Sequence, residues 1–530
     1  MSELFHECGV AAVYHREGNA VSPLVAGDDP NASARLIPRM LLDMQNRGQL
    51  SAGMTSFRHG RGQLLDTFKE IGSVQEVFRL SHSGKCESLM TEYAGHAAIG
   101  HVRYATCGKD DRSFAQPFER HHIQKGKWFS FGFNGQLANY RQLRKELLDS
   151  TDHHLARESD TELIMHCISR HLSRHQPGGR QALLDMITAV DEQVDGAYSL
   201  AYINALGEML IARDPLGIKP MCYATDGTLL AAASETVALT NLGFTRSQIS
   251  FLPPGHALTV VDNEIDVRPY ASATGSAYCF FEWIYFANVA SNLDGRSVYL
   301  TRTALGNELA RLEQQSGIDI DENTIVVPVP DTSKAAADAM AYELGIPSRE
   351  GLIRNRYSGR TFIEGHATRE ERARMKYTPL RDVLAGRRVL LVEDSIVRST
   401  TMQVLLGKIY EAGASEIHVR VACPPIVAPC YYGIDMSRIN ELFAPRFLGK
   451  HLLLTEEIQQ AMARELGCDS LRYLPLESIA SAIGFEANQL CQACISGEYP
   501  TPAGQQLYQL DRSGASDSSS RAYDFNPDPA

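Results

Sequence analysis

The sequence feature that most constrains the fold is the stretch RVLLVEDSIVRSTTM, residues 388 to 402. A short apolar run ends there at an acidic pair, Glu393 and Asp394, and a helical pattern begins near Thr400. From about residue 296, helical patterns alternate in this way with short runs rich in β-branched residues. Such alternation is typical of βαβ units, so we expect an α/β domain with a parallel sheet in the second half.

The loop between this strand and this helix carries hydroxyl side chains. A helix N-terminus presents free N–H groups, so we expect the loop to bind phosphate with help from Ser395, Ser399, Thr400 and Thr401. The acidic pair repels phosphate and must therefore serve another group, either ribose hydroxyls or a divalent metal ion. A strand–loop–helix turn with hydroxyls present by chance is the alternative interpretation.

The first half has a different pattern. Residues 8 to about 262 contain many short apolar runs separated by Gly, Asn and Asp, which indicate strands and turns. Two helical patterns interrupt them, at Ile37–Arg47 and at Asp160–Arg174, and the second begins with the capping sequence SDTE. We therefore expect stacked sheets covered by helices.

Composition narrows the classes of function. The chain has 530 residues and a formal net charge of −12, which argues against a large nucleic-acid surface. No apolar run approaches the ~20 residues of a membrane helix, and residues 1–7 lack the pattern of a signal peptide. We expect a cytoplasmic protein, in which the 11 cysteines are free, catalytic or metal-bound. The polar stretch at 504–530 predicts a disordered tail.

Cys8 stands directly before the first predicted strand, in LFHECGVAAVYHR. A buried strand cysteine that packs as a small hydrophobe is one interpretation. The other is that residues 1–7 are removed and that Cys8 becomes a nucleophile. Its free amine, with a pKa of roughly 7.7–8.0, would then act as the base for its own thiol.

Near the C-terminus, NQLCQACISGEYPTP contains Cys491 and Cys494 in a CxxC spacing. In the cytosol such a pair can be redox-active or can bind zinc or an iron–sulfur cluster. Two unrelated core thiols remain the alternative.

Two motifs of the second half resemble those of the type I phosphoribosyltransferases. The stretch VEDSIVRSTT resembles their phosphoribosyl pyrophosphate motif, with Glu393 in place of an Asp and Ser399 in place of a Gly. The loop VVPVPDTSKAA resembles their pyrophosphate-binding loop. The resemblance implies substrate contacts from Asp331, Ser333 and Lys334, and Mg²⁺ contacts from Thr332, Glu393 and Asp394. The basic segment 354–376 between the motifs is interpreted as a loop that closes over a polyanion, or alternatively as a solvated basic face.

The first half resembles, nearly end to end, the glutaminase domain of the N-terminal nucleophile hydrolases, which have an αββα sandwich. The motifs ECGVAAVYH, MQNRGQLSAGM, IGHVRYATCG, FNGQLANY and RESDTELI occur in the family's order. The resemblance implies Cys8 as the nucleophile and an oxyanion hole formed by Asn134 and Gly135. It implies glutamine binding by Arg103, Thr106 and Asp160.

As a whole, the chain resembles the amidophosphoribosyltransferase family. The resemblance implies a propeptide at 1–7, a glutaminase domain at 8–262 and a phosphoribosyltransferase domain at 263–503. It implies that ammonia from glutamine converts phosphoribosyl pyrophosphate to 5-phosphoribosylamine in purine synthesis, with Mg²⁺, purine nucleotide inhibitors and a homo-oligomer (tetramer or dimer). The alternatives are another glutamine amidotransferase, which would lack VEDSIVRSTT, and a nucleotide-sensing regulator that keeps the fold without the reaction.

Bacillus-type members of that family carry a [4Fe–4S] cluster held by four cysteines. AYCFFEWIYFA and APCYYGIDM match the ligand segments, so the resemblance implies Cys279, Cys430, Cys491 and Cys494 as ligands. Tetrahedral zinc is the alternative occupant. We interpret the other thiols as structural, namely Cys86, Cys107, Cys167, Cys222, Cys423 and Cys468.

Overall fold

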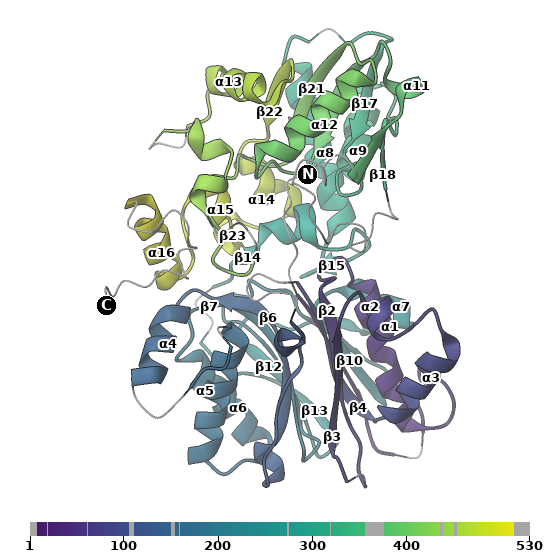
Figure 1. Ribbon diagram of the computed structural model, residues 1–530, viewed down its shortest axis with the longest axis vertical. Coiled ribbons are helices and arrows are strands. Elements are labelled where there is room, and N and C mark those ends of the chain that lie inside the picture. Colours follow the sequence, from purple (N-terminus) through teal and green to yellow (C-terminus); the bar gives the residue numbers. More distant parts are fainter. Residues whose placement is uncertain are drawn as a thin grey trace.

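The computed structural model describes residues 8–18, 20–60, 62–104, 111–149, 154–157, 159–272, 275–318, 320–355, 376–434, 436, 438–449 and 453–513. Figure 1 shows two halves, with the first half of the sequence below and the second half above. Thr106, Cys107, the expected propeptide and most of the basic segment 354–376 lie outside the described residues.

Two antiparallel sheets form the centre of the first half, within the described residues. One sheet has the order β11 (Ile249–Phe251), β9 (Cys222–Thr225), β10 (Leu229–Ala233), β1 (Gly9–His15), β4 (Ala97–Arg103), β2 (Ser51–Phe57) and β3 (Leu65–Ile71). The other has the order β13 (Glu264–Pro269), β12 (His256–Val261), β8 (Met209–Arg213), β7 (Gly196–Asn204), β6 (Phe129–Leu137) and β5 (Phe118–Arg120).

The sheets pack face to face because their strands are apolar on both sides. In β1, Val10 and Ala12 point into the layer between the sheets, whereas Ala11 and Val13 point toward covering helices. The first sheet is covered by α1 (Leu36–Asp43), α2 (Val74–Val77), α3 (Ser83–Glu92) and α7 (Thr236–Leu242). The second is covered by α4 (Tyr140–Asp149), α5 (Asp160–Arg174) and α6 (Arg180–Asp191). The expected αββα sandwich is confirmed.

The two predicted helices of this half have different outcomes. Helix α5 spans the predicted Asp160–Arg174, and the Ser159 side chain accepts a hydrogen bond from the Glu162 N–H at its start. Helix α1 ends at Asp43 instead of at Arg47. The chain turns after Met44, and this turn brings the buried Arg47 side chain to two carboxylates.

The second half contains the expected parallel sheet, with the order β17 (Thr324–Pro328), β20 (Arg388–Glu393), β21 (Glu416–Val421) and β22 (Ser470–Tyr473) among the described residues. Nearly all of its side chains are buried, as in a sheet covered on both faces. The longer helices are α8 (Val298–Gln314), α9 (Lys334–Leu344), α12 (Ser399–Glu411) and α13 (Glu456–Leu466). Shorter elements are β15 (Asn292–Leu293), β16 (Arg296–Ser297), β18 (Leu352–Arg354), β19 (Tyr377–Pro379), α11 (Arg381–Leu384) and α14 (Glu477–Ile483).

The halves meet at a junction formed by distant parts of the sequence (Figure 1). Strand β14 (Tyr278–Cys279) pairs in parallel with β23 (Leu490–Cys491), and the short helix α15 (Ala493–Ser496) follows. A π-helical turn, η5 (Glu282–Phe286), follows β14 and is fully buried. These segments place residues of the C-terminal part beside the start of the second half.

Two boundaries differ from those expected. Residue 262 lies in the turn between the paired strands β12 and β13, so the sheet of the first half continues to Pro269. Residues 504–513 were expected in a disordered tail, but they belong to helix α16 (Pro502–Ser513). That helix is ordered because it buries Leu507 and Tyr508 against the junction. Among the described residues, no helix has the length and apolar character needed to cross a membrane.

Candidate functional site

The first group of predicted site residues lies where β1 begins and β4 ends. Cys8 directly precedes β1, and Gly9 pairs with Val102, so Cys8 lies beside the end of β4. Its half-buried thiol points to the carbonyl oxygen of Tyr104, with an Sγ–O distance of 3.7 Å. Arg103 is buried and lies over the ring of Phe114 at 5.4 Å. The thiol and this guanidinium are therefore on adjacent strands.

Strand β6 of the facing sheet contributes Asn134 and Gly135. The Nδ2 atom of Asn134 is buried and has no hydrogen-bond partner among the described residues. A Cβ at Gly135 would lie 1.9 Å from the carbonyl oxygen of Ala197, so only glycine fits there. Leaving a buried amide unsatisfied costs about 1–3 kcal/mol, which a bound acceptor would recover. An unsatisfied donor of this kind is what an oxyanion site needs.

Asp160, the remaining described residue of this group, is tied to the same strand. Its Oδ2 accepts a hydrogen bond from the N–H of Leu137, at 2.9 Å, where β6 ends. Since β1 and β4 pack against β6, the structure brings these predicted residues to one region. Thr106 lies outside the described residues.

Two residues that hold this strand were not indicated by any sequence motif. His101 donates from Nε2 to the carbonyl oxygen of Phe133 at 3.0 Å, and Gln116 accepts from the Phe133 N–H at 2.7 Å. Burial lowers the pKa of His101 to about 3, so its ring is neutral. The backbone N–H and carbonyl groups of Phe133, the residue before Asn134, are therefore both held by hydrogen bonds.

The second group lies where β17 and β20 end. These strands pair in parallel, so the loops that follow them are neighbours. The hydroxyl of Thr332 donates to Oδ2 of Asp394, and the hydroxyl of Ser395 donates to Oδ1 of the same carboxylate at 2.7 Å. Ser333 Oγ is buried without a hydrogen-bond partner among the described residues. Both predicted phosphate loops therefore meet at Asp394.

The two carboxyl groups of this site are completely buried. Burial raises the pKa of Glu393 to about 8, with a further contribution from the charge of Asp394, and burial also raises the pKa of Asp394. Two adjacent buried carboxylates are costly unless a cation offsets their charge. With the Thr332 hydroxyl, this all-oxygen donor set suits Mg²⁺.

The remaining predicted residues line the edge of this site. Ser399, Thr400 and Thr401 form the first turn of α12, and the hydroxyl of Ser399 accepts from Arg446 at 3.1 Å. Lys334 and Asp331 lie at the start of α9. Lys334 pairs with Glu350 at 2.5 Å, and Asp331 pairs with Arg354 at 3.2 Å. Both ion pairs are partly exposed and therefore weak, so a charged ligand can replace one partner of each pair.

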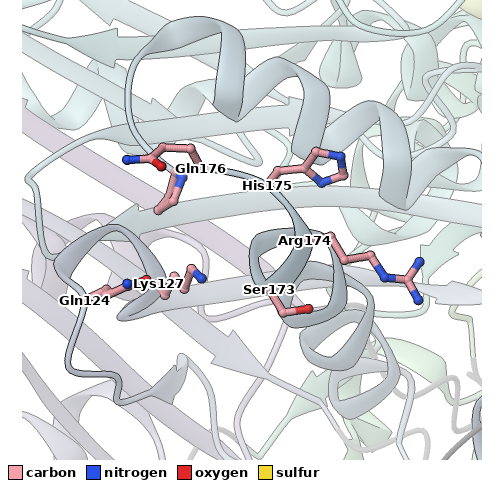
Figure 2. A pocket seen from close by; sticks show the side chains of 7 residues that line it. Gln124, Lys127, Ser173, Arg174, His175 and Gln176 are labelled. Carbon is pink, nitrogen blue, oxygen red and sulfur yellow. The ribbon is translucent and has the colours of Figure 1, made fainter.

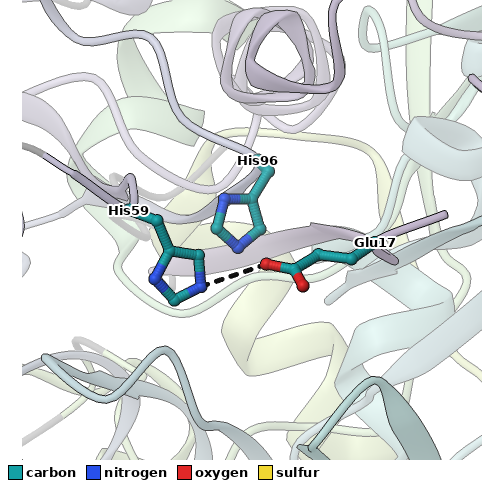
Figure 3. Close-up of side chains that lie close together, drawn as sticks. All are labelled: Glu17, His59 and His96. Atoms are coloured by element: carbon teal, nitrogen blue, oxygen red, sulfur yellow. Dashed lines mark ion pairs between the residues drawn. The ribbon is translucent and has the colours of Figure 1, made fainter.

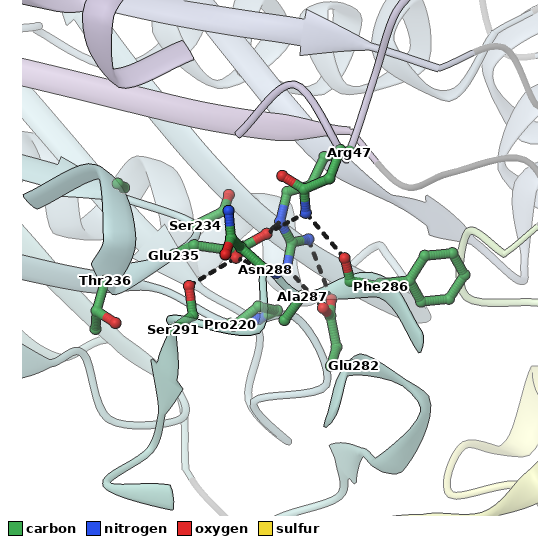
Figure 4. Close-up of polar contacts among 12 residues, drawn as sticks. Arg47, Pro220, Ser234, Glu235, Thr236, Glu282, Phe286, Ala287, Asn288 and Ser291 are labelled. Carbon is green, nitrogen blue, oxygen red and sulfur yellow. Dashed lines mark hydrogen bonds and ion pairs between the residues drawn. The ribbon is translucent and has the colours of Figure 1, made fainter. Parts of the chain in front are cut away.

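A buried ionic network joins the two halves (Figure 4). The guanidinium of Arg47 lies 2.6 Å from a carboxylate oxygen of Glu235 and 2.6 Å from one of Glu282. Asn46 donates to the carbonyl oxygen of Phe286 at 2.9 Å. Glu235 also accepts from the N–H of Asn288 at 2.7 Å. The first half therefore binds the segment that begins at η5 through hydrogen bonds and ion pairs.

The second half holds the same segment from its other side. Arg302 of α8 donates to the carbonyl oxygens of Trp283, Tyr285 and Ala287 at 2.9, 3.1 and 3.0 Å. Burial raises the pKa of Tyr285 well above its usual range, and the nearby Asp394 and Glu393 add to the effect. The segment therefore runs from the Arg47 network to the neighbourhood of the acidic pair. Arg47 occurs in the motif MQNRGQLSAGM of the glutaminase resemblance, but the sequence indicated no junction role for Arg47 or Glu235.

All four cysteines named as cluster ligands line one cavity at the junction. Each is buried, with 7–8% of its surface exposed, and the β14–β23 pairing places Cys279 opposite Cys491. The sulfur of Cys430 accepts a hydrogen bond from the N–H of Tyr432 at 3.4 Å. Burial raises the pKa of the Cys491 thiol to about 12. Cys423 is buried elsewhere and does not line this cavity.

Another hollow lies on the first half, where η3 (Lys125–Lys127) approaches the end of α5 (Figure 2). It is lined by Gln124, Lys127, Ser173, Arg174, His175, Gln176 and Pro177. None of the predicted site residues belongs to it.

A cysteine that starts the central strand of an αββα sandwich, joined to a parallel sheet whose strands end in phosphate-type loops, defines a glutamine amidotransferase fused to a phosphoribosyltransferase. A family model described as a glutamine amidotransferase domain matches residues 69–253. The amidophosphoribosyltransferase of Methanothermobacter thermautotrophicus is 37% identical over 504 residues, which cover 94% of this chain and 96% of that protein. This chain belongs to the amidophosphoribosyltransferase family.

Further relatives agree. The amidophosphoribosyltransferase of Bacillus subtilis is 36% identical over 474 residues, covering 88% of this chain and 91% of that protein. The solved structure of glutamine phosphoribosylpyrophosphate amidotransferase from B. subtilis, complexed with ADP and GMP, matches with a TM-score of 0.77 and 32% identity. The match covers 94% of this chain and 98% of that one. The alternative of a regulator without the reaction receives no support.

Proposed function

We propose that this enzyme hydrolyses glutamine to glutamate and ammonia, and that it uses the ammonia to convert phosphoribosyl pyrophosphate to 5-phosphoribosylamine, the first step of purine nucleotide synthesis. The observation that carries the proposal is the presence of two separate site constellations in one chain. One surrounds Cys8 and the other surrounds Asp394, and the buried Arg47 network connects the halves that hold them.

In the first site, the Cys8 sulfur attacks the carboxamide carbon of glutamine. The amine of Cys8, once residues 1–7 are removed, takes the thiol proton and delivers it to the leaving ammonia. Asn134 Nδ2 and the Gly135 N–H stabilise the oxyanion, and such a donor contributes about 10²–10³ in kcat. Arg103 binds the α-carboxylate and Asp160 binds the α-amino group of glutamine, with Thr106 as a further contact. Water then releases glutamate from the thioester.

In the second site, ammonia displaces pyrophosphate from C1 of the ribose ring. Ser333, Lys334 and Asp331 position the pyrophosphate, and the α12 N-terminus with Ser395, Ser399, Thr400 and Thr401 holds the 5-phosphate. Mg²⁺, when bound by Thr332, Glu393 and Asp394, supplies positive charge to the leaving pyrophosphate. The protein performs no covalent step here, so positioning of the two reactants accounts for the rate.

We also propose a [4Fe–4S] cluster on Cys279, Cys430, Cys491 and Cys494. All four thiols are buried around one cavity, and four thiolates are the ligand set of such a cluster. Tetrahedral zinc on the same four thiols is the alternative occupant, and metal analysis distinguishes the two. The Lys219 ammonium lines the same cavity and favours the thiolates.

The cluster's role in this proposal is structural. A Cβ at Gly433, three residues after Cys430, would lie 3.3 Å from the carbonyl carbon of Gly135. The segment that holds the cluster therefore rests on the strand of the oxyanion site. We further propose that purine nucleotides inhibit the enzyme and that it forms a homo-oligomer. The support is the family and the ADP and GMP named for the B. subtilis structure.

The experiment that tests the function assigns each chemistry to its own site. Cys8→Ala should abolish glutamine-dependent synthesis and leave synthesis from added ammonium salt unchanged. Asp394→Asn should abolish synthesis from both nitrogen sources and leave hydrolysis of glutamine measurable. Cys86→Ala, at a half-buried thiol in α3, is the matched control and should behave like the unaltered enzyme. Loss of both activities in well-folded Cys8→Ala would contradict the proposal.

A further inference from the structure

Three strands of the first sheet bring a carboxylate and two imidazoles together at the edge away from Cys8 (Figure 3). Glu17 follows the end of β1, His59 follows the end of β2, and His96 directly precedes β4. β4 lies between β1 and β2 and is antiparallel to both, so these three chain ends meet. β1 begins beside Cys8 and has seven residues, so the cluster lies roughly 20 Å or more from the thiol.

The three side chains point toward one another. One ligand atom from each lies within 4.8 Å of the others, and no other set of three His, Cys, Asp or Glu residues meets this limit among the described residues. Oε1 of Glu17 is 3.2 Å from Nε2 of His59. The rings of His59 and His96 are stacked, with centroids 5.1 Å apart and an interplanar angle of 15°.

The position of His96 differs from that of a residue in an ordinary surface ion pair. It is only 6% exposed, and its Nε2 is buried without a hydrogen-bond partner among the described residues. That nitrogen points toward Glu17 and His59 in Figure 3. A buried polar atom without a partner costs about 1–3 kcal/mol. A cation between the three side chains would satisfy it together with the exposed Glu17–His59 pair.

The surroundings hold the ligands in place and leave an entry path. The ring of Phe57 meets both imidazoles edge-on, at 4.8 Å for His59 and 5.2 Å for His96. The carbonyl oxygen of His96 accepts from the N–H of His15 at 2.7 Å. Glu17 and His59 have about 60% of their side-chain surface exposed, so an ion can reach the site from solvent.

We propose that Glu17, His59 and His96 form a binding site for a divalent transition-metal ion of the zinc type, separate from the two catalytic sites. Two imidazole nitrogens and a carboxylate oxygen are a common ligand set for zinc, with a fourth position left to water. The bound ion would fasten the ends of three neighbouring strands to one another.

Zinc binding by the full-length enzyme tests this proposal. Equilibrium dialysis against Zn²⁺, followed by elemental analysis, should show one zinc fewer per chain in His59→Ala than in the unaltered enzyme. Glu17→Gln, at an exposed position, should weaken binding of that ion at least tenfold. His121→Ala is the matched control, because His121 is an exposed histidine 3.3 Å from Glu119 that belongs to no such set of three. It should keep the full zinc content.

Co²⁺ supplies a second readout that separates this site from the cysteines. Cobalt bound by nitrogen and oxygen ligands gives weak visible bands without the intense charge-transfer band of a thiolate. These weak bands should appear with one equivalent of Co²⁺ and disappear in His59→Ala. Equal zinc content and equal cobalt spectra in His59→Ala, His121→Ala and the unaltered enzyme would overturn the proposal.

Discussion

The guanidinium of Arg47, in the first half, lies 2.6 Å from the carboxylate of Glu282, in the second half, and both side chains are buried. Buried charges are stable only with a partner, and the buried Glu282 of the second half has its partner in Arg47 of the first half. Glu282 opens the turn whose Tyr285 lies near the acidic pair. Arg47 also packs against Gly9, where an added Cβ would lie 3.2 Å from its Cδ, so the contact links the start of β1, beside Cys8, to the neighbourhood of the acidic pair.

Removal of the Glu282 charge should uncouple the two sites. Glu282→Gln removes the charge-assisted contact that Arg47 makes across the junction, while Glu235 still balances the Arg47 charge, so we expect a loss of about 1.5–3 kcal/mol of stability. We expect a lower melting temperature and a larger fall in glutamine-dependent than in ammonia-dependent synthesis. Glu308→Gln breaks a surface pair with Arg311 and is the matched control. Equal falls in both activities would argue against a coupling role.

Asn134→Ala should impair glutamine hydrolysis in a specific way. The Nδ2 atom of Asn134 has no hydrogen-bond partner among the described residues, so removal of this donor breaks no hydrogen bond to any of them. Loss of one oxyanion donor should lower kcat for glutamine about 10²–10³-fold, with little change in KM. Ammonia-dependent synthesis should be retained. A mainly raised KM would show that Asn134 binds glutamine in its ground state instead.

Stability should depend on pH through Asp191, which accepts from the hydroxyl of Tyr198, the residue paired with Gly135. Burial raises the pKa of Asp191 from 3.8 to about 6. The folded state then binds more protons than the unfolded state between these values, so this group's contribution to stability is complete below pH 3.8 and is lost as pH rises through 6.

Asp191→Asn should remove the loss of stability that ionisation of Asp191 causes as the pH rises. Relative to the unaltered enzyme, the variant should gain stability on the order of 2 kcal/mol between pH 4 and pH 7. Chemical denaturation at both pH values measures the difference. A stability difference that does not change with pH would show that Asp191 titrates alike in the folded and unfolded states.

The cysteine cavity predicts a difference between two buried thiols. Cys491→Ala should lower the iron content, bleach the brown colour of anaerobically purified protein and expose the C-terminal segment to proteolysis. Cys423→Ala, at a buried thiol that does not line the cavity, should change none of these. A colourless protein with stoichiometric zinc that is lost in Cys491→Ala would contradict the cluster.

Local sequence patterns predicted many of the helices and strands, because each type of element has its own spacing of apolar residues. The capping sequence before Asp160 placed α5 correctly, and the apolar runs that end at Glu393 and in the loop before Lys334 placed two adjacent strands of the parallel sheet. Helix α16 was missed because its sequence is mostly polar, and its order depends on burying Leu507 at the junction.

The candidate site was predictable where the chemistry lies in one short segment and unpredictable where it depends on packing. Cys8 and Asp394 stand in motifs that indicate their chemistry. Glu282 and Arg302 act through contacts with residues far away in the sequence. Nothing in a linear pattern shows which arginine will be buried or which carboxylate will meet it.

We infer that ammonia released at Cys8 is used at Asp394 inside the same molecule. The most direct test gives the enzyme glutamine labelled with ¹⁵N in its amide, phosphoribosyl pyrophosphate and Mg²⁺, in an excess of unlabelled ammonium. We expect equal amounts of glutamate and pyrophosphate, and ¹⁵N in nearly all of the phosphoribosylamine, which is trapped by a coupled reaction. A product whose label is diluted to that of the ammonium pool, or glutamate formed without pyrophosphate, would contradict it.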